Sequence, residues 1–198
     1  MKQTLKRMFS LLENHYGTTH WWPGDTPFEI AIGAILTQNT AWSNVEKAIA
    51  ALKQAQLLQP TRMRAVPLET LETAVRPSGY YRQKSKRLRT FCDYLITEYH
   101  GSMEEMATRP LDILRSELLG LNGIGPETAD DILLYSCEKP IFVVDTYTRR
   151  ILSRHNIVPE DIGYNELQKL FHSNLPADVR LFKEFHGLIV YTGKDFCR

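Results

Sequence analysis

The chain has 198 residues, of which 43% are hydrophobic and 24% charged, with a formal net charge of +1. This composition excludes wholesale disorder, and the length allows one compact domain or two small lobes. The near-zero net charge gives no general support for nucleic-acid binding, which would have to depend on local basic clusters. No segment approaches the ~20 apolar residues of a membrane span, and the charged N-terminus lacks a secretory signal's apolar run. We therefore expect a cytoplasmic protein.

Helical periodicity dominates the sequence. Apolar residues at spacings of three and four predict an amphipathic helix over residues 4–16, which Gly17 ends. Pro27 opens an apolar run that is typical of a buried helix with proline in its first turn. Further helices are predicted at about 42–55, 67–74, 82–99, 110–119, 126–137, 145–155, 163–173 and 177–192.

Strand signals are scarce. The β-branched run PIFVVD, residues 140–145, is the strongest, but it lies between predicted helices and has no partner run. We predict an extended, buried connection there. The sequence as a whole predicts an all-α fold with short helices and tight loops.

Residues 118–136 (LLGLNGIGPETADDILLYS) hold the most informative pattern, with Gly123 and Gly125 between two predicted helices. Glycine lets the backbone turn tightly, and the first turn of the following helix adds exposed amides with the helix dipole behind them. This arrangement suits a phosphate of the DNA backbone and gives no base preference. Taken alone, the two glycines fit a plain helical hairpin equally well.

The wider pattern is more specific. From Leu121 to Thr128 it reads L-x-G-I-G-x-x-T, which resembles the helix-hairpin-helix of the endonuclease III superfamily of DNA glycosylases. Three further segments resemble that superfamily in the same order, and together they extend the likeness over essentially the whole chain: AILTQNT (34–40), SGYYRQKSKRL (78–88) and VVDTYTRR (143–150).

The resemblance implies two helical lobes with a cleft between them. One lobe comprises residues 1–24 and 132–198, and the other comprises residues 25–131 and ends in the hairpin, at about 112–136. It implies a monomer that acts on double-stranded DNA at the nucleoid. It also implies hairpin contacts to DNA, and a monovalent cation that the hairpin carbonyls of Leu119, Leu121 and Ile124 would hold. The residues implied in DNA binding are Leu121, Gly123, Ile124, Gly125 and Thr128.

Asp145 begins a predicted helix and suits an N-cap, because its carboxylate can accept hydrogen bonds from first-turn amides. Its place in VVDTYTRR also matches the superfamily's catalytic aspartate. Cleavage of an N-glycosidic bond develops positive charge on the sugar, which a carboxylate stabilises while it orients the attacking water. We expect both roles to hold for Asp145.

The residue at position 127 indicates whether the protein can also cleave the DNA strand. Superfamily members that also cleave the DNA strand carry a lysine at this position, whose amine forms a Schiff base with the sugar. Because glutamate cannot form an imine, we predict a monofunctional glycosylase that uses water and requires no cofactor for its chemistry. The alternative for Glu127 is a first-turn acid that the helix dipole favours.

Glu127 and the segment Trp21-Trp22-Pro23 together resemble the endonuclease III-like 3-methyladenine glycosylases. That likeness places a base between Trp21 and Trp42, with Glu127 lining the pocket. Alkylation at N3 makes the base cationic, which favours aromatic faces and a neighbouring carboxylate. Any of the tryptophans could instead belong to the core, Trp22 before the others.

Gln38 matches the position that fills the gap left by a flipped nucleotide, although a buried amide bonded to backbone is the alternative. Lys84 lies in the basic run of residues 82–89, which could hold phosphates or simply be solvated. Cys197 would be the first ligand of an iron–sulfur cluster in a longer chain. We expect no metal site in the present one, whose three cysteines form no close pair.

Two other functions fit parts of the pattern. One is an endonuclease III-type glycosylase and lyase for oxidised pyrimidines, which the missing lysine disfavours. The other is a non-catalytic DNA-binding protein that uses only its hairpin, which Asp145 and the aromatic pocket residues disfavour. A glycosylase for alkylated bases such as 3-methyladenine accounts for the most residues.

Overall fold

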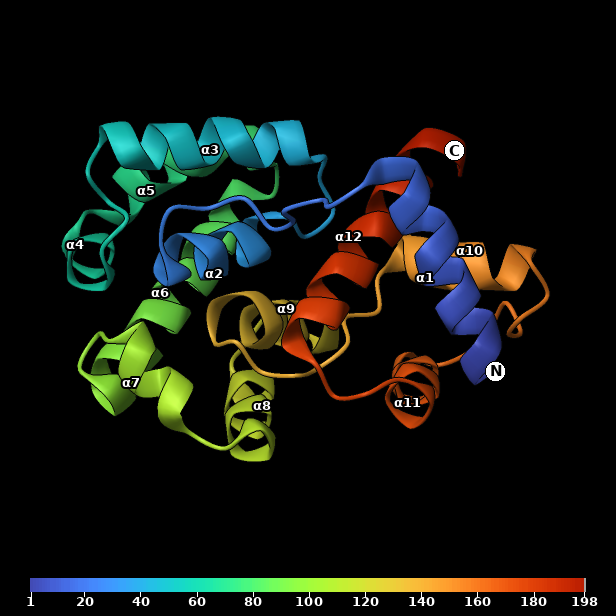
Figure 1. The fold of residues 1–198 in the computed structure, drawn as a ribbon. Helices are drawn as coiled ribbons and strands as arrows, with labels where there is room; N and C mark the ends of the chain where they lie inside the picture. The colour runs from blue at the N-terminus through green and yellow to red at the C-terminus, as the bar shows by residue number, and fades with distance from the viewer. Residues whose placement is uncertain (198) are drawn as a thin grey trace. The chain divides into compact units, whose positions relative to one another are not determined.

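The structure is a computed structural model that describes residues 1–197. Those residues form twelve α-helices, a 3-10 turn and a π-helical turn, with no strand among them (Figure 1). The expected all-α class is therefore confirmed. The chain divides into two compact units, one of residues 24–137 and one of residues 1–23 together with the chain from Glu138 onward.

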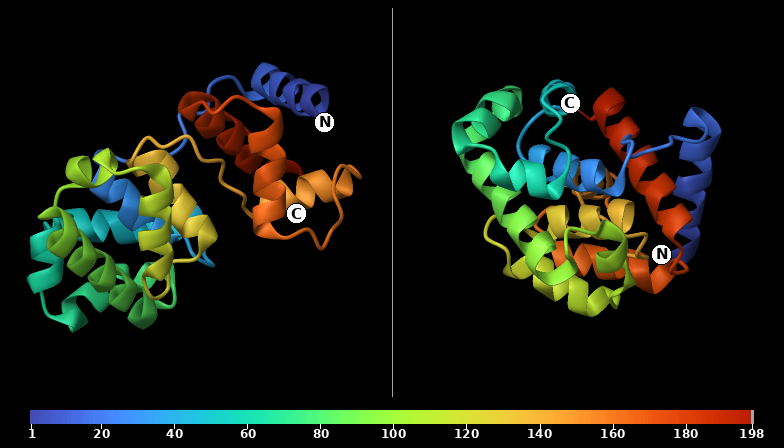
Figure 2. Two further views of the ribbon diagram at one scale, coloured as in Figure 1. Left: turned by 90° about the horizontal axis from the view of Figure 1, so that it is seen from below. Right: turned by 90° about the vertical axis from the view of Figure 1, so that its left-hand side faces the viewer.

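The unit of residues 24–137 is built around the apolar helix α2, which packs against α3, α6, α9 and η2. Thr26 caps α2 by accepting a hydrogen bond from the Glu29 amide at 3.1 Å, and Pro27 occupies its first turn. The long helix α6 packs against α2, α4, α5 and α7 (Figure 2). The elements are α2 (Pro27–Leu36), α3 (Trp42–Gln54), α4 (Pro60–Ala65), α5 (Leu68–Val75), η1 (Arg76–Ser78), α6 (Tyr81–Tyr99), α7 (Met103–Thr108), α8 (Leu111–Gly120), α9 (Pro126–Asp131) and η2 (Ile132–Ser136).

The other unit contains α1 (Lys2–Tyr16), α10 (Thr146–Arg154), α11 (Tyr164–Asn174) and α12 (Val179–Phe196). Helix α12 packs against α1 and α10. The core of this unit contains a cluster of fully buried phenylalanine rings, in which Phe142 and Phe171 stack with centroids 3.7 Å apart. Because Phe142 belongs to the extended segment that precedes α10, this cluster anchors the segment that leads to Asp145.

The predicted boundaries need three corrections. Gly24 and residues 132–137, which were expected in the terminal lobe, belong to the unit of residues 24–137. Ile132, Leu133 and Leu134 are fully buried, and η2 packs against α2. The helix expected over 126–137 changes to a π-helical turn at Ile132. The short helices α4 and α7 were not predicted. The extended, buried connection expected at 140–145 is confirmed, since the residues from Ile141 to Val144 are buried and form no regular element.

Candidate functional site

The hairpin turn lies between α8 and α9. Gly123 has a φ of +87°, which favours glycine, whereas Gly125 has a φ of −91° that any residue adopts. The Ile124 amide closes the turn by donating to the Leu121 carbonyl at 3.1 Å, and that carbonyl retains a second lone pair. A β-carbon at Gly125 would meet no atom within 4 Å, so the exposed start of α9 is open to an approaching group.

Two polar contacts hold the hairpin from inside its own unit. Arg115 on α8 pairs with Asp130 on α9, with Nε 2.7 Å from Oδ1 and Nη2 3.1 Å from Oδ2, and Asp130 is fully buried. Gln38 donates from Nε2 to the Gly123 carbonyl at 3.0 Å and to the Thr128 hydroxyl at 2.9 Å. The turn is therefore fixed by α8 on one side and, on the other, by Gln38 in the turn that follows α2.

Lys84 corrects a prediction. Its side chain is fully buried, and Nζ donates to the carbonyls of Leu36 at 2.8 Å and Ser78 at 2.6 Å. Burial, followed by the nearby charge of Arg87, lowers the pKa of Lys84 to about 8. The expected DNA contact of Lys84 is wrong, because its ammonium is committed to backbone carbonyls away from the surface.

Asp145 is the N-cap of α10, as predicted. Its Oδ1 accepts from the Thr148 amide at 2.6 Å and from the Thr148 hydroxyl at 2.7 Å. Oδ2 lies 3.8 Å from Nε2 of His186 on α12, and the side chain is 14% exposed. The cap thus holds one oxygen of the carboxylate, while the other lies beside His186.

His186 beside Asp145 was not predicted. Burial lowers the pKa of the imidazole, and the charge of Asp145 raises it by a smaller amount. The lowered pKa favours a neutral ring at neutral pH, so His186 is not a cationic partner of the Asp145 carboxylate.

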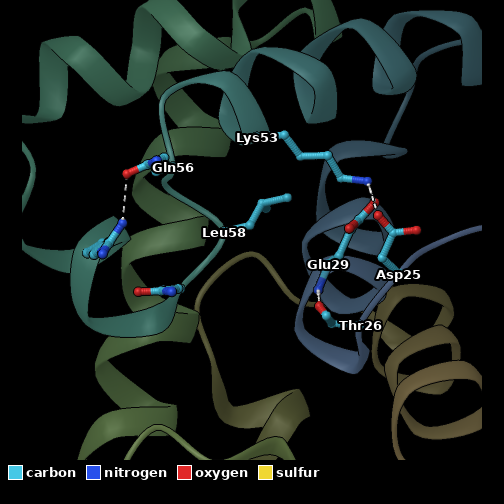
Figure 3. A pocket seen from close by; sticks show the side chains of 8 residues that line it. Asp25, Thr26, Glu29, Lys53, Gln56 and Leu58 are labelled. Atoms are coloured by element: carbon cyan, nitrogen blue, oxygen red, sulfur yellow. Dashed lines mark hydrogen bonds and ion pairs between the residues drawn. The ribbon is translucent and has the colours of Figure 1, made fainter.

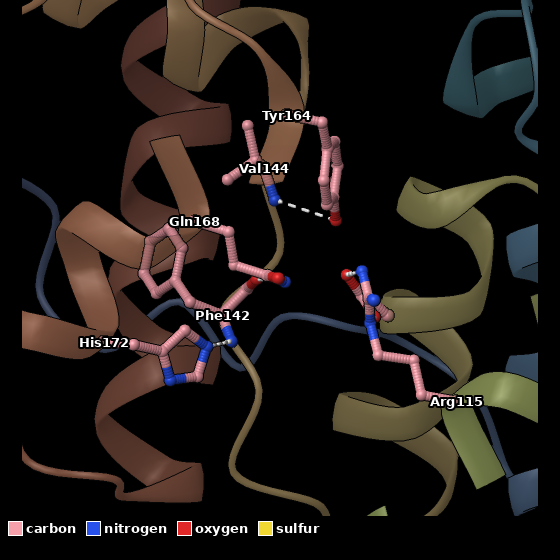
Figure 4. A network of polar contacts seen from close by, with 7 residues as sticks. Arg115, Phe142, Val144, Tyr164, Gln168 and His172 are labelled. Atoms are coloured by element: carbon pink, nitrogen blue, oxygen red, sulfur yellow. Dashed lines mark hydrogen bonds and ion pairs between the residues drawn. The ribbon is translucent and has the colours of Figure 1, made fainter. Parts of the chain in front are cut away.

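The segment that leads to Asp145 is tied to α11 by three hydrogen bonds (Figure 4). The Phe142 amide donates to Nε2 of His172 at 3.1 Å, and the Phe142 carbonyl accepts from Nε2 of Gln168 at 2.7 Å. The Val144 amide lies 3.5 Å from the Tyr164 hydroxyl. These contacts satisfy three polar groups of a buried backbone that has no sheet partner, and they fix the position of the residue before Asp145.

Trp21 belongs to the same unit as Asp145 and is half-buried. Its ring lies edge-on to Tyr191, with centroids 6.1 Å apart, and Nζ of Lys194 lies 4.8 Å from its centroid. Tyr191 and Lys194 both come from α12 and were not predicted near Trp21. Trp22, expected in the core before the others, is half-buried like Trp21.

Trp42 and Glu127 belong to the unit of residues 24–137. Trp42 begins α3, is half-buried, and donates from Nε1 to Glu46 at 3.0 Å. Glu127 is exposed in the first turn of α9, next to Gly125 and Pro126. A carboxylate at this point of a helix is favoured by the dipole, in accord with the alternative reading of Glu127.

A pocket of 460 Å³ in the unit of residues 24–137 contains none of the predicted site residues (Figure 3). Lys53 lies 2.7 Å from Asp25 and 2.8 Å from Glu29, and Arg62 donates to Gln56 at 3.1 Å. The lining residues are Asp25, Thr26, Glu29, Lys53, Gln56, Leu58, Gln59 and Arg62. Because Lys53 pairs with both carboxylates of this pocket and Arg62 is bonded to Gln56, we assign no ligand to it.

Within residues 1–197, no group of three or more histidine, cysteine, aspartate or glutamate side chains could hold a metal ion. Cys92 and Cys137 are buried, and Cys197 follows α12 half-exposed. No helix in this range is long and apolar enough to cross a membrane.

Residues 32–177 match the HhH-GPD superfamily of base excision DNA repair proteins. The chain belongs to this superfamily. Within it, a DNA repair glycosylase of Methanocaldococcus jannaschii, so named, is 44% identical over 198 residues, which are 99% of this chain and 90% of the relative. Endonuclease III of Thermotoga maritima is 31% identical, over 87% of this chain and 75% of its own.

Two solved structures of HhH-GPD proteins are similar to this chain over nearly its whole length. The H. pylori 3-methyladenine DNA glycosylase bound to 1,N6-ethenoadenine has a TM-score of 0.81 and 31% identity, over 98% of this chain and 96% of its own. An endonuclease III trapped in a covalent intermediate with DNA has a TM-score of 0.85 and 26% identity, over 100% of this chain and 88% of its own. Both likenesses extend over both units of the HhH-GPD chain.

Proposed function

We propose that the protein is a monofunctional DNA glycosylase that removes alkylated bases such as 3-methyladenine from double-stranded DNA. The carboxylate of Asp145 carries this proposal. It is held at one oxygen by Thr148 and lies beside a histidine whose lowered pKa favours the neutral ring. Its place in VVDTYTRR also resembles that of the superfamily's catalytic aspartate. No other described residue combines these properties with that position.

The chemistry follows from the two oxygens of Asp145. Oδ1 serves the α10 cap, so Oδ2 is the oxygen that would face the sugar and the attacking water. As the bond to the base breaks, positive charge grows on the sugar ring, and a charged carboxylate stabilises it. Because burial favours neutral His186, that charge on Asp145 is not offset by an imidazolium.

The absence of lyase activity rests on Glu127. Schiff-base formation needs an amine at this position, and Glu127 presents a carboxylate in the exposed first turn of α9. We expect water to complete the reaction, which leaves an intact strand with an abasic site.

The proposed preference for alkylated bases rests on the resemblance to 3-methyladenine glycosylases and on the contact between Trp21 and Lys194. The ammonium of Lys194 lies over the Trp21 ring, so this ring face accepts a cation. A cationic base stacked on that face would displace Lys194. We propose Trp21, Trp42 and Glu127 as the residues that contact the base.

DNA binding is proposed for the hairpin. The open space beside Gly125 and the exposed first turn of α9 suit a phosphate, with the dipole of α9 adding to the attraction. We assign the backbone contacts to Leu121, Gly123, Ile124, Gly125 and Thr128. The carbonyls of Leu119, Leu121 and Ile124 are the proposed ligands of a monovalent cation at the turn.

The decisive experiment is chromatography of the bases that the protein frees from methylated duplex DNA. Release of 3-methyladenine without strand cleavage supports the proposal, and failure to release any methylated base overturns it. A covalent adduct with abasic DNA after borohydride reduction would overturn the monofunctional assignment. Because the endonuclease III of Thermotoga maritima is also 31% identical, DNA with oxidised pyrimidines belongs in the same assay.

A further inference from the structure

The side chain of Gln38 is fully engaged with the hairpin. Both hydrogens of its Nε2 are donated, one to the Gly123 carbonyl at 3.0 Å and one to the Thr128 hydroxyl at 2.9 Å. Its oxygen accepts a hydrogen bond from Nη1 of Arg87. No N–H of this amide remains to pair with an orphaned base, so the structure gives Gln38 a different partner from the one its sequence position predicts.

Arg87 also fills the space beside Gly123. A β-carbon at position 123 would lie 2.7 Å from both Cγ and Cδ of Arg87, which is closer than real β-carbons approach their neighbours. The aliphatic part of Arg87 therefore packs where a side chain at 123 would otherwise stand. Arg87 supports the turn by packing and, through Gln38, by hydrogen bonding.

Lys84 holds the neighbouring backbone from the same helix. One turn before Arg87 on α6, it donates to the Leu36 carbonyl at the end of α2 and to the Ser78 carbonyl. The loop that carries Gln38 is thus anchored at its start by Lys84 and at its side chain by Arg87. The first half of α6 therefore fixes the position of Gln38.

We propose that Gln38 and Arg87 are positioning residues of the hairpin. The hydrogen bonds from Arg87 to Gln38, and from Gln38 to Gly123 and Thr128, hold the turn in the shape that meets a DNA phosphate. Their contribution is then to the affinity for any duplex, damaged or intact. This inference rests on the proposed function only in requiring that the hairpin binds the DNA backbone. A residue that fills the gap of a flipped nucleotide would instead contribute only where a nucleotide is missing from the stack.

The test compares affinities for an undamaged duplex and for the same duplex with one abasic analogue. We expect Gln38→Ala and Arg87→Met each to weaken binding to both duplexes about tenfold, which leaves the ratio of the two affinities unchanged. Because both variants break one chain of contacts, the double variant should bind no more weakly than the weaker single variant. Lys86→Met is the matched control, since it removes one positive charge from an exposed position next to Arg87 on the same helix.

Two conservative variants, Gln38→Glu and Arg87→Lys, test whether weaker binding comes from the lost contacts or from loss of folding. Glutamate retains an acceptor for Arg87 but cannot donate to Gly123, so it should bind as weakly as the alanine variant. Lysine retains the charge of Arg87 but not its planar group, and it should restore less than half of the lost affinity on a logarithmic scale. Melting temperatures recorded alongside confirm that each variant is folded at the assay temperature.

Three results would overturn the proposal: a loss by Gln38→Ala that is confined to the abasic duplex, an Arg87→Met effect no larger than that of Lys86→Met, or additive losses in the double variant. Base release by the wild-type protein is measured in the same preparation. A wild-type protein that binds both duplexes but frees no methylated base would overturn the proposed function and leave this inference standing.

Discussion

Helix α12 and the hairpin turn use glycine in different ways. In α12, a β-carbon at Gly193 would lie 2.7 Å from Cβ of Tyr147, and one at Gly187 would lie 2.5 Å from the Thr19 hydroxyl. Neighbouring side chains thus occupy the space that both glycines leave. Through these close approaches α12 holds α10, which begins after Asp145, and the segment that carries Trp21.

The hairpin contains both kinds of glycine. Gly123 is like the α12 glycines, because Arg87 fills the space beside it, whereas the space beside Gly125 is open. Gly125 needs no unusual backbone conformation either, since its φ is −91°. The proposed function places the sugar chemistry in the packed region, at Asp145, and the contact to the DNA backbone in the open one, at Gly125.

Replacing Asp145 with asparagine should affect base release and leave duplex binding almost unchanged, which is the largest difference that we expect between the two regions. Asparagine can still accept from the Thr148 amide, so the α10 cap survives, but the charge that we propose to stabilise the sugar is lost. We expect base release to fall by about 10³-fold and duplex affinity to change by less than about twofold. Single-turnover release of methylated bases and a parallel binding titration measure the two effects. Release at the wild-type rate would remove Asp145 from the mechanism.

A pair of alanine substitutions sharpens the comparison of the glycines. Gly193→Ala should lower the free energy of unfolding by about 1–3 kcal/mol, because the new methyl group collides with Tyr147. Gly125→Ala should change that free energy by less than about 0.5 kcal/mol and yet weaken duplex binding about tenfold. Urea unfolding and binding titrations check both variants. Wild-type affinity in Gly125→Ala would mean that no group approaches this glycine.

His186 makes the stability of the unit that contains α12 depend on pH in the acid range. Because burial lowers its pKa below the ordinary value near 6.5, the unfolded chain binds the extra proton first. Its contribution to stability is complete above about pH 6.5 and is lost as the pH falls through the folded pKa. We expect the stability difference between wild type and His186→Phe to shift against the wild type from pH 7 to 5, as unfolding curves at each pH would show. A difference that is constant with pH contradicts a buried, neutral imidazole.

Lys84 makes the stability of the hairpin's unit depend on pH in the alkaline range. Its folded pKa of about 8 lies below the ordinary 10.5, so the unfolded chain binds more protons between these values. Relative to Lys84→Met, the stability of the wild type should rise with pH across this window, by at most about 1.4 kcal/mol per pH unit. The comparison with the variant cancels the ionisation of tyrosines and cysteines. Parallel pH profiles would contradict the lowered pKa of Lys84.

Local features of the site were predictable from the sequence. The Asp145 cap, the glycine turn and the proline at the start of α9 all depend on residues within a few positions of one another. Helix α7 was missed although its signal was present, since Ser102 and Glu105 have capping-box spacing and Ser102 accepts from the Glu105 amide at 3.1 Å.

Long-range features were not predictable. Gln38 and Gly123 are 85 residues apart in the chain, and no local pattern announces their hydrogen bond. Lys84 was misassigned because helical spacing shows which residues share a face but not whether a lysine in a basic run turns inward. His186 likewise lies in a helix whose periodicity gives no sign of Asp145 beside it.

The extended segment before α10 should tolerate no change in its number of residues. Residues 141–144 run as an isolated strip whose backbone is tied to α11 at Phe142 and Val144, so the register of this strip sets how far along it Asp145 falls. Inserting or deleting one residue there would turn successive side chains to the opposite side. The carboxylate would then be misdirected although every residue named in the mechanism was still present, and tolerance to such indels should be lower here than in any exposed loop.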